Sequence, residues 1–353
     1  MNKQGFIEAN RVRLAYVQWG TGVPTIVCAH GLTDAALCWT RTALALVERG
    51  HCVLAFDARG HGYSAAPGIG YDAATFAADL RALLAALPIE RPLLIGHSMG
   101  AHTVTLLGAD AGLTRGIVLE DPPWRDAERL FSAEQLALWK EQQRHTNTLT
   151  IEEIIAAGAD EAAGWNELEI QTWAESGRLA QPEVLDWIHN TYPIDWRGAV
   201  QQLAVPTLLI TADPARGAIV DAEQAAEARQ LNTLLQLAHI PGAGHSIRRD
   251  NFAAYLAALD GFSALLGETQ GFDVWGARPR PCARCAKRRP SSNTYCTMSH
   301  KSRPPACATG LTVGAFCISS ATCAIWKMGL WRACAHCSTN SPTRYWPVST
   351  FML

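Results

Sequence analysis

Short apolar runs and longer amphipathic segments alternate along the first two thirds of the chain. The runs are bounded by Gly or Pro, as is typical of strands that a parallel sheet buries on both faces. The segments between them, such as 75–87 and 221–231, have helical spacing, and Asp221 with Gln224 fits a helix-starting capping box. We therefore predict an α/β fold, with a mostly parallel central sheet flanked by helices on both faces. The apolar runs are residues 26–29, 53–56, 92–95, 116–119, 206–211 and 235–240.

Residues 122–197 interrupt this alternation and show no strand pattern. Ser132 with Gln135 and Thr150 with Glu153 fit capping boxes, and Pro182 suits the first turn of a helix. We interpret the segment as a helical cap inserted into a core made of residues 1–121 and 198–268.

The cap segment is rich in tryptophan. Most of these rings are expected to pack the cap onto the core, with one or two touching a substrate. We assign Trp39 and Trp124 to the substrate pocket. The tryptophans of the segment are Trp124, Trp139, Trp165, Trp173, Trp187 and Trp196.

Ser98 is the candidate nucleophile. It lies in the sequence Gly-His-Ser-Met-Gly at 96–100, directly after the apolar run 92–95. A strand that runs into G-x-S-x-G is typical of a nucleophile elbow, a turn so tight that glycine is needed on either side of the serine. The helix that follows points its N-terminus at the hydroxyl.

A serine hydroxyl needs a base, and the chain supplies an acid and a histidine downstream. Asp213 ends the run 206–211, and His245 follows the run 235–240 within Gly-Ala-Gly-His-Ser. We predict that His245 takes the serine proton and that Asp213 orients the imidazole. Glu120 and Asp121, at the end of the run 116–119, are the alternative acids.

Acyl transfer also needs hydrogen-bond donors for the oxyanion. The strand 26–29 ends in His30-Gly31-Leu32, and the glycine allows this loop to approach the nucleophile. The backbone N–H groups of Leu32 and Met99 are the predicted donors. We expect His30 to bond loop backbone rather than to move protons.

Taken together, these motifs resemble the α/β-hydrolase superfamily over roughly residues 5 to 267. The matching pieces are His30-Gly31, the loop 57–64 (Asp-Ala-Arg-Gly-His-Gly-Tyr-Ser), the elbow, Asp213 and Gly244-His245. The chain looks most like esterases and lipases with a helical cap. The resemblance implies that the loop 57–64 supports the site, so that His61 braces a loop. Members that open epoxides or displace halides use an aspartate at the elbow, and the serine here disfavours those reactions.

We therefore interpret the chain as a cofactor-free serine hydrolase that cleaves carboxylic esters of small molecules through an acyl-enzyme. A lactonase, a perhydrolase acting as a metal-free haloperoxidase, and a non-enzymatic receptor of the same fold are the alternatives. The glycine spacings of phosphate and dinucleotide loops are absent from the sequence, so no cofactor, no metal and no nucleic acid is expected.

The N-terminus lacks the basic start and apolar core of a secretory signal. Cys28, Cys38 and Cys52 are the only cysteines before residue 271, and we expect them to be reduced thiols in a cytoplasmic protein.

The sequence changes character at about Gly271. The segment 271–353 holds eight of the 11 cysteines and 11 of the 30 basic residues, but only one of the 32 acidic residues. Two Cys-x-x-Cys pairs, at 282–285 and 334–337, could form a zinc site, and the uncharged stretch 304–326 could span a membrane. We prefer an unstructured basic extension or a translated wrong frame, which the catalytic unit does not need.

Overall fold

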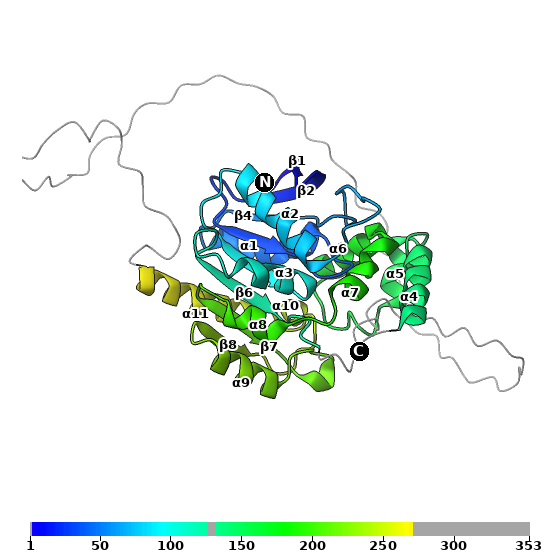
Figure 1. The fold of residues 1–353 in the computed structure, drawn as a ribbon. Helices are drawn as coiled ribbons and strands as arrows, with labels where there is room; N and C mark the ends of the chain where they lie inside the picture. The colour runs from blue at the N-terminus through cyan, green and yellow to red at the C-terminus, as the bar shows by residue number, and fades with distance from the viewer. Residues whose placement is uncertain (1, 126–131, 271–353) are drawn as a thin grey trace, which may run out of the picture. The chain divides into compact units, whose positions relative to one another are not determined.

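An eight-stranded sheet forms the centre of the protein in a computed structural model, which describes residues 2–125 and 132–270 (Figure 1). The strands lie in the order β1-β2-β4-β3-β5-β6-β7-β8. Strand β2 pairs antiparallel with β1 and β4, and the other neighbours are parallel. This confirms the predicted mostly parallel sheet. The strands are β1 (Asn2–Ala9), β2 (Val12–Trp19), β3 (Ile26–Ala29), β4 (Val53–Phe56), β5 (Leu93–His97), β6 (Gly116–Glu120), β7 (Thr207–Thr211) and β8 (Leu235–His239).

The central strands are buried along their whole length. Successive side chains of a strand point to opposite faces, so each strand contributes to two apolar cores. In β5, for example, Leu94 belongs to one core while Leu93 and Ile95 belong to the other. This two-sided burial explains why the runs read as continuous apolar stretches rather than as an alternation.

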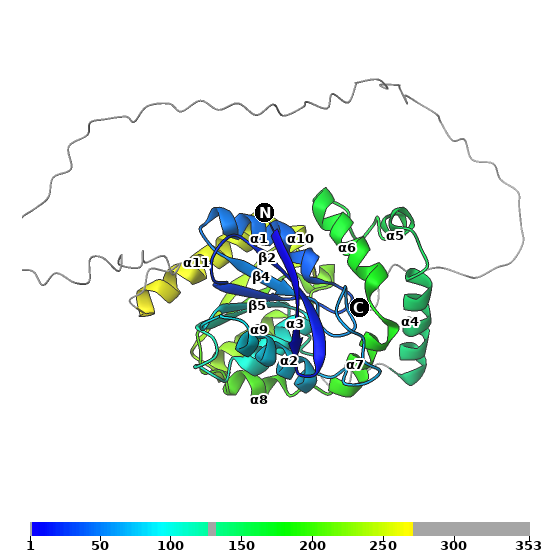
Figure 2. The ribbon, with the colours of Figure 1, turned by 90° about the horizontal axis from the view of Figure 1, so that it is seen from above.

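Helices cover both faces of the sheet, as predicted (Figure 2). Residues of α1 and α11 pack in one core, and residues of α2, α3, α8 and α9 pack in the other. Helix α11 contributes Tyr255, Leu259 and Phe262 to the first of these cores. These helices are α1 (Thr40–Glu48), α2 (Ala73–Ala86), α3 (Met99–Leu107), α8 (Trp196–Gln201), α9 (Ala222–Leu231) and α11 (Phe252–Gln270).

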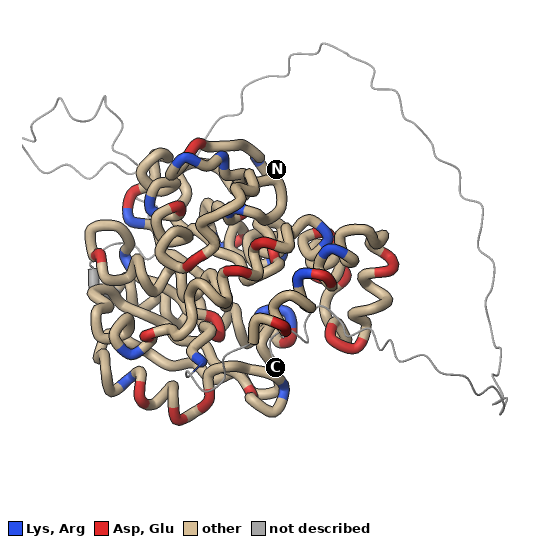
Figure 3. The backbone as a smooth tube through the Cα atoms, turned by 45° about the vertical axis from the view of Figure 1, so that its right-hand side comes forward, with Lys and Arg blue, Asp and Glu red and all other residues tan. Residues whose placement is uncertain are grey.

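The described part of the segment between β6 and β7 contains helices joined by turns and loops, and no strand. Both predicted capping boxes are present, at Ser132 and at Thr150, and Pro182 lies in the first turn of η3. Acidic residues are spread over these helices (Figure 3). The elements before α8 are α4 (Ala133–Thr146), α5 (Ile151–Ala157), α6 (Glu167–Leu179), η3 (Pro182–Leu185) and α7 (Asp186–Thr191).

Helices α5 and α6 have a small apolar core of their own. It contains Ile154, Ala162, Trp165, Trp173 and Ala174, and it is separate from the two cores of the sheet. This part of the insertion therefore contacts the rest of the protein outside the two sheet cores. One such contact is the polar network between Glu169 of α6 and Arg249, described below.

The interpretations of residues 271–353 as a zinc site, a membrane span or an unstructured extension lie outside the described residues. Within residues 2–125 and 132–270, no helix combines the length and apolar character that a membrane crossing requires.

Buried histidine is expected to make the stability of this fold sensitive to acid. Burial lowers the pKa of His102, on α3, to about 4, whereas an unfolded histidine titrates near 6.5. Between these values the unfolded chain binds the proton and the folded chain does not, so stability falls as the pH falls from about 6.5.

We predict that His102→Gln reduces the loss in unfolding free energy between pH 7 and pH 5 by about 2 kcal/mol. Urea unfolding at both pH values measures this difference. His145→Gln, which replaces an exposed histidine in the same way, is the control. An equal acid sensitivity of wild type and His102→Gln would contradict the prediction.

Candidate active site

Ser98 lies on a strained turn between β5 and α3. Its backbone has φ 50° and ψ −118°, a conformation that side-chain-bearing residues rarely adopt. The flanking glycines allow this turn. A Cβ at Gly96 would overlap the backbone of Gly100, and a Cβ at Gly100 would overlap the carbonyl group of Ala29. The arrangement is that of a nucleophile elbow at the carboxyl end of the sheet.

His245 is held by Asp121, the residue that follows β6. The Nδ1 atom of His245 lies 2.6 Å from Oδ2 of Asp121, whose side chain is fully buried. The same carboxylate accepts hydrogen bonds from the backbone N–H groups of Ile219, at 2.8 Å, and Val220, at 3.0 Å. These donors keep a buried carboxylate hydrogen-bonded, so it can fix the orientation of the imidazole.

The expectation that Asp213 orients His245 is therefore wrong, and the alternative acid Asp121 stands in its place. The carboxylate of Asp213 contacts His239 Nε2 at 3.1 Å and accepts the N–H of Gly242 at 2.7 Å. It braces the loop that leads to His245 and is half-exposed. Asp121 takes the place of Asp213 because the chain turns sharply at the end of β6. There Asp121 has a φ of 42°, and its carboxylate contacts His245.

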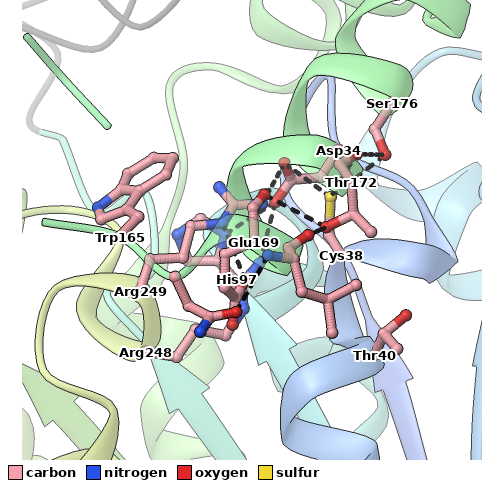
Figure 4. A network of polar contacts seen from close by, with 12 residues as sticks. Asp34, Cys38, Thr40, His97, Trp165, Glu169, Thr172, Ser176, Arg248 and Arg249 are labelled. Atoms are coloured by element: carbon pink, nitrogen blue, oxygen red, sulfur yellow. Dashed lines mark hydrogen bonds and ion pairs between the residues drawn. The ribbon is translucent and has the colours of Figure 1, made fainter. Parts of the chain in front are cut away.

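Glu120, the other alternative acid, has a different partner. Its carboxylate accepts the backbone N–H of Arg248 at 2.8 Å and the guanidinium of Arg248 at 3.2 Å. Burial raises the pKa of Glu120, and the neighbouring Arg248 and Arg249 oppose this rise. Glu120 thus joins a buried ion-pair network through Arg248, which also contacts Asp34. Figure 4 shows Arg248, Arg249 and Asp34 of this network.

The loop after β3 passes close to the nucleophile, as the sequence predicts. A Cβ at Gly31 would lie 2.7 Å from His97 Nδ1 and 3.5 Å from the Cβ of Ser98. Leu32 follows, and Met99 is the first residue of α3, where backbone N–H groups have no intrahelical acceptor. The predicted oxyanion donors therefore come from two segments that meet at Ser98.

His30 and His61 have the bracing roles expected of them. His30 Nδ1 contacts the carbonyl of Gly31 at 2.8 Å, and its Nε2 accepts the N–H of Ala58 at 2.9 Å. His61 Nδ1 contacts the carbonyl of Arg59 at 2.9 Å. Burial, with His30 nearby, lowers the pKa of His61 to about 3, so its ring is neutral near pH 7.

A cavity of about 390 Å³ opens beside these residues. Leu32, His97 and His245 line it from the sheet side, and Trp165 and Trp173 line it from the insertion. Its charged lining residues are Asp34, Asp160, Glu161, Arg216, Arg249 and Asp250.

The assignment of Trp39 and Trp124 to the pocket is wrong, since neither lines this cavity. Trp39 lies fully buried beneath the guanidinium of Arg248, 4.4 Å from its ring centre. Trp124 stacks on Trp196 with ring centres 4.9 Å apart. The tryptophans that line the cavity are instead Trp165 and Trp173, whose position depends on how the insertion folds.

Two atoms of the candidate site are buried without a hydrogen-bond partner in the described part of the chain: Ser98 Oγ and His245 Nε2. Their neighbour His97 bonds the carbonyl of His245 through Nε2 at 3.1 Å. Burial and the charge of Arg248 lower the pKa of His97 to about 3, so it adds no charge beside His245 near pH 7. Ser98 is 1% exposed, so its hydroxyl is covered by neighbouring groups in this structure.

No cluster of three or more His, Cys, Asp or Glu side chains within residues 2–125 and 132–270 has the arrangement of a metal site. The site described above consists of Ser98, His245 and Asp121 with backbone donors.

The fold and the order of these residues define a hydrolase class. The model of the alpha/beta hydrolase family matches residues 26–259, and the chain belongs to this family.

Curated relatives of the chain include hydrolases and non-heme haloperoxidases. N-formylmaleamate deformylase of Pseudomonas putida is 28% identical over 75% of this chain and 95% of its own length. The 2-(acetamidomethylene)succinate hydrolase of Mesorhizobium japonicum is 26% identical over 72% of this chain and 93% of its own length. A crystal structure of E-2-(acetamidomethylene)succinate hydrolase superposes with a TM-score of 0.64 at 24% identity, covering 74% of this chain and 99% of that one.

We predict that Asp121→Asn lowers kcat for an activated ester by about 10³- to 10⁴-fold, because the amide no longer fixes the imidazole in its productive form. Asp213→Asn is the matched control and should cost less than about tenfold, since it weakens only the brace of the preceding loop. Steady-state kinetics on both variants test this, with thermal melting to confirm folding. An Asp213→Asn variant as impaired as Asp121→Asn would contradict the assignment.

Proposed function

We propose that the protein is a serine hydrolase that cleaves carboxylic esters of small molecules through an acyl-enzyme on Ser98. The observation that carries this proposal is the buried Asp121–His245 pair beside a serine on a strained elbow. Such a turn costs free energy, and elbows of this kind present nucleophiles.

In this mechanism His245 Nε2 takes the proton of Ser98 while Oγ attacks the carbonyl carbon of the ester. The N–H groups of Leu32 and Met99 stabilise the oxyanion of the tetrahedral intermediate. The imidazolium then protonates the departing alcohol, and Asp121 stabilises its charge. Water, deprotonated by His245, attacks the acyl-enzyme and releases the acid.

The helical insertion acts as the cap of the substrate cavity in this proposal. Trp165 and Trp173 line the cavity from that side. Cys28, Cys38 and Cys52 are buried free thiols, in keeping with a reducing cytoplasmic environment.

A small N-acyl amide is the second candidate substrate. The curated relatives at 28% and 26% identity are a deformylase of N-formylmaleamate and a hydrolase of 2-(acetamidomethylene)succinate, both of which are N-acyl compounds by name. The same serine mechanism serves either bond, because His245 protonates a departing nitrogen as it does an oxygen.

We predict that Ser98→Ala abolishes hydrolysis of p-nitrophenyl esters, with a loss of at least about 10³-fold, while the melting temperature stays within a few degrees. A fluorophosphonate probe should label the wild type and not the variant, as mass spectrometry of the intact protein would show. The proposed function is contradicted if the wild type neither reacts with the probe nor hydrolyses any ester or N-acyl amide.

The charges of the cavity favour a substrate without a carboxylate. The cavity lining carries four carboxylates (Asp34, Asp160, Glu161 and Asp250) and two guanidinium groups (Arg216 and Arg249). The guanidinium of Arg249 is paired with Asp34 at 2.8 Å. Asp250 also lines the cavity, and its hydrogen-bond donors are the neutral Trp165 Nε1 and the N–H of Gly244. A carboxylate on the acyl chain of a substrate would be repelled by the acidic side chains that line the cavity.

We therefore expect kcat/KM for p-nitrophenyl butyrate to exceed that for mono-p-nitrophenyl succinate by at least about tenfold. The two esters share the leaving group and nearly the same length, so the ratio isolates the charge. Raising the ionic strength should narrow the difference. A faster reaction of the succinate ester would show that the cavity binds anions.

A further inference from the structure

The predicted oxyanion loop, residues 30–34, is fixed at both ends. His30 holds its start through the contacts with Gly31 and Ala58 described above. At the other end, the N–H of Asp34 donates to the carbonyl of Gly31 at 3.1 Å and closes a tight turn. Leu32 lies between the two fixed points, so the direction of its N–H depends on both.

Thr33, within this turn, has a φ of 67°. This left-handed conformation is unfavourable for a β-branched residue and is rarely adopted without support from neighbouring structure. The loop therefore requires an interaction that opposes relaxation of Thr33 to an extended conformation. Asp34, the next residue, supplies the strongest polar contacts of the loop.

Two consecutive arginines bind the carboxylate of Asp34. Arg249 Nη2 lies 2.8 Å from Oδ1, and Arg248 Nη2 lies 3.1 Å from Oδ2 (Figure 4). All three side chains are less than 10% exposed. Burial would raise the pKa of Asp34, but Arg249, His97 and Arg248 hold it well below the usual value, so the carboxylate is charged.

The arginines are themselves held by the elements around the site. Arg248 pairs with Glu120 at the end of β6 and lies over the ring of Trp39. Arg249 lies 3.5 Å from Glu169 of α6 and over the ring of Trp165. Both belong to α10 (Ile247–Asp250), which starts two residues after His245. The position of Asp34 is thereby defined relative to the catalytic histidine.

We infer that Asp34 is a positioning residue of this hydrolase: its ion pairs with Arg248 and Arg249 hold Thr33 in the left-handed conformation and so direct the N–H of Leu32 toward the oxyanion. The inference rests on the proposed function. It assigns to the ion-pair network a role in transition-state binding, in addition to its contribution to stability.

The test compares the wild type with Asp34→Asn, which keeps the size of the side chain and removes its charge. Loss of one oxyanion donor costs about 10²- to 10³-fold in kcat, and partial misplacement should cost about 10- to 100-fold, with KM within about threefold. The affinity for a trifluoromethyl ketone should fall in parallel, because its tetrahedral adduct needs the same donor. Asp260→Asn, which removes the charge from the Arg49–Asp260 pair, is the control and should leave both quantities unchanged.

Rescue by glycine separates positioning from general stability. Glycine adopts positive φ readily, so Asp34→Asn combined with Thr33→Gly should recover at least about threefold of the lost kcat and of the ketone affinity. Thr33→Gly alone is measured as the reference for the double variant. Where Asp34→Asn does not fold, Arg249→Gln, which leaves Arg248 on the carboxylate, is expected to show the same losses to a smaller degree.

The inference is overturned if Asp34→Asn keeps kcat and ketone affinity within about threefold of the wild type. It is equally overturned if melting temperature and kcat fall while ketone affinity is preserved, or if Thr33→Gly restores nothing. Failure of the proposed function is recognised separately, since the wild type would then neither react with a fluorophosphonate nor hydrolyse any ester or N-acyl amide.

Discussion

The hydrogen bond between Asp121 and His245 is the constraint on which the rest of the site depends. A carboxylate that is fully buried is costly unless its oxygens are hydrogen-bonded, and here the N–H groups of Ile219 and Val220 supply bonds that His245 alone does not. The base is therefore oriented only when the end of β6, the loop before α9 and the loop after β8 are all in place. The orientation of the His245 ring therefore depends on the same contacts that pack the carboxyl edge of the sheet.

Much of the fold could be predicted from the sequence because its determinants are local. Runs buried on both faces identify the parallel strands, capping boxes mark the starts of α4, α5 and α9, and the glycines around Ser98 identify the elbow. The hairpin of β1 and β2 gave no such signal. Strand β1 lies at the edge of the sheet and pairs only with β2, and most of its side chains are exposed or half-buried.

The acid could not be chosen from the sequence, because Asp121 and Asp213 each follow a parallel strand and both ends lie at the same edge of the sheet. What distinguishes them is the donor pair at 219–220, close to Asp213 in sequence yet bonded to Asp121. Such contacts depend on the path of a loop, which residue patterns do not specify. The arginines that bind Asp34 are hidden for a similar reason, since Arg248-Arg249 looks like an exposed basic turn until burial and partners are known.

The end of β6 links the two halves of the catalytic apparatus. Glu120 and Asp121 are adjacent, yet their carboxylates meet different partners: Glu120 holds Arg248, while Asp121 holds His245. Through Arg248 the first contact extends to Asp34 and the loop that carries Leu32, whereas the second sets the base. Strand β6 pairs with β5, and the last residue of β5 precedes Ser98. One pair of neighbouring strands therefore positions the proposed nucleophile, the proposed base and the predicted oxyanion loop. In the proposed mechanism, a displacement of this strand end would therefore disturb proton transfer and oxyanion binding together.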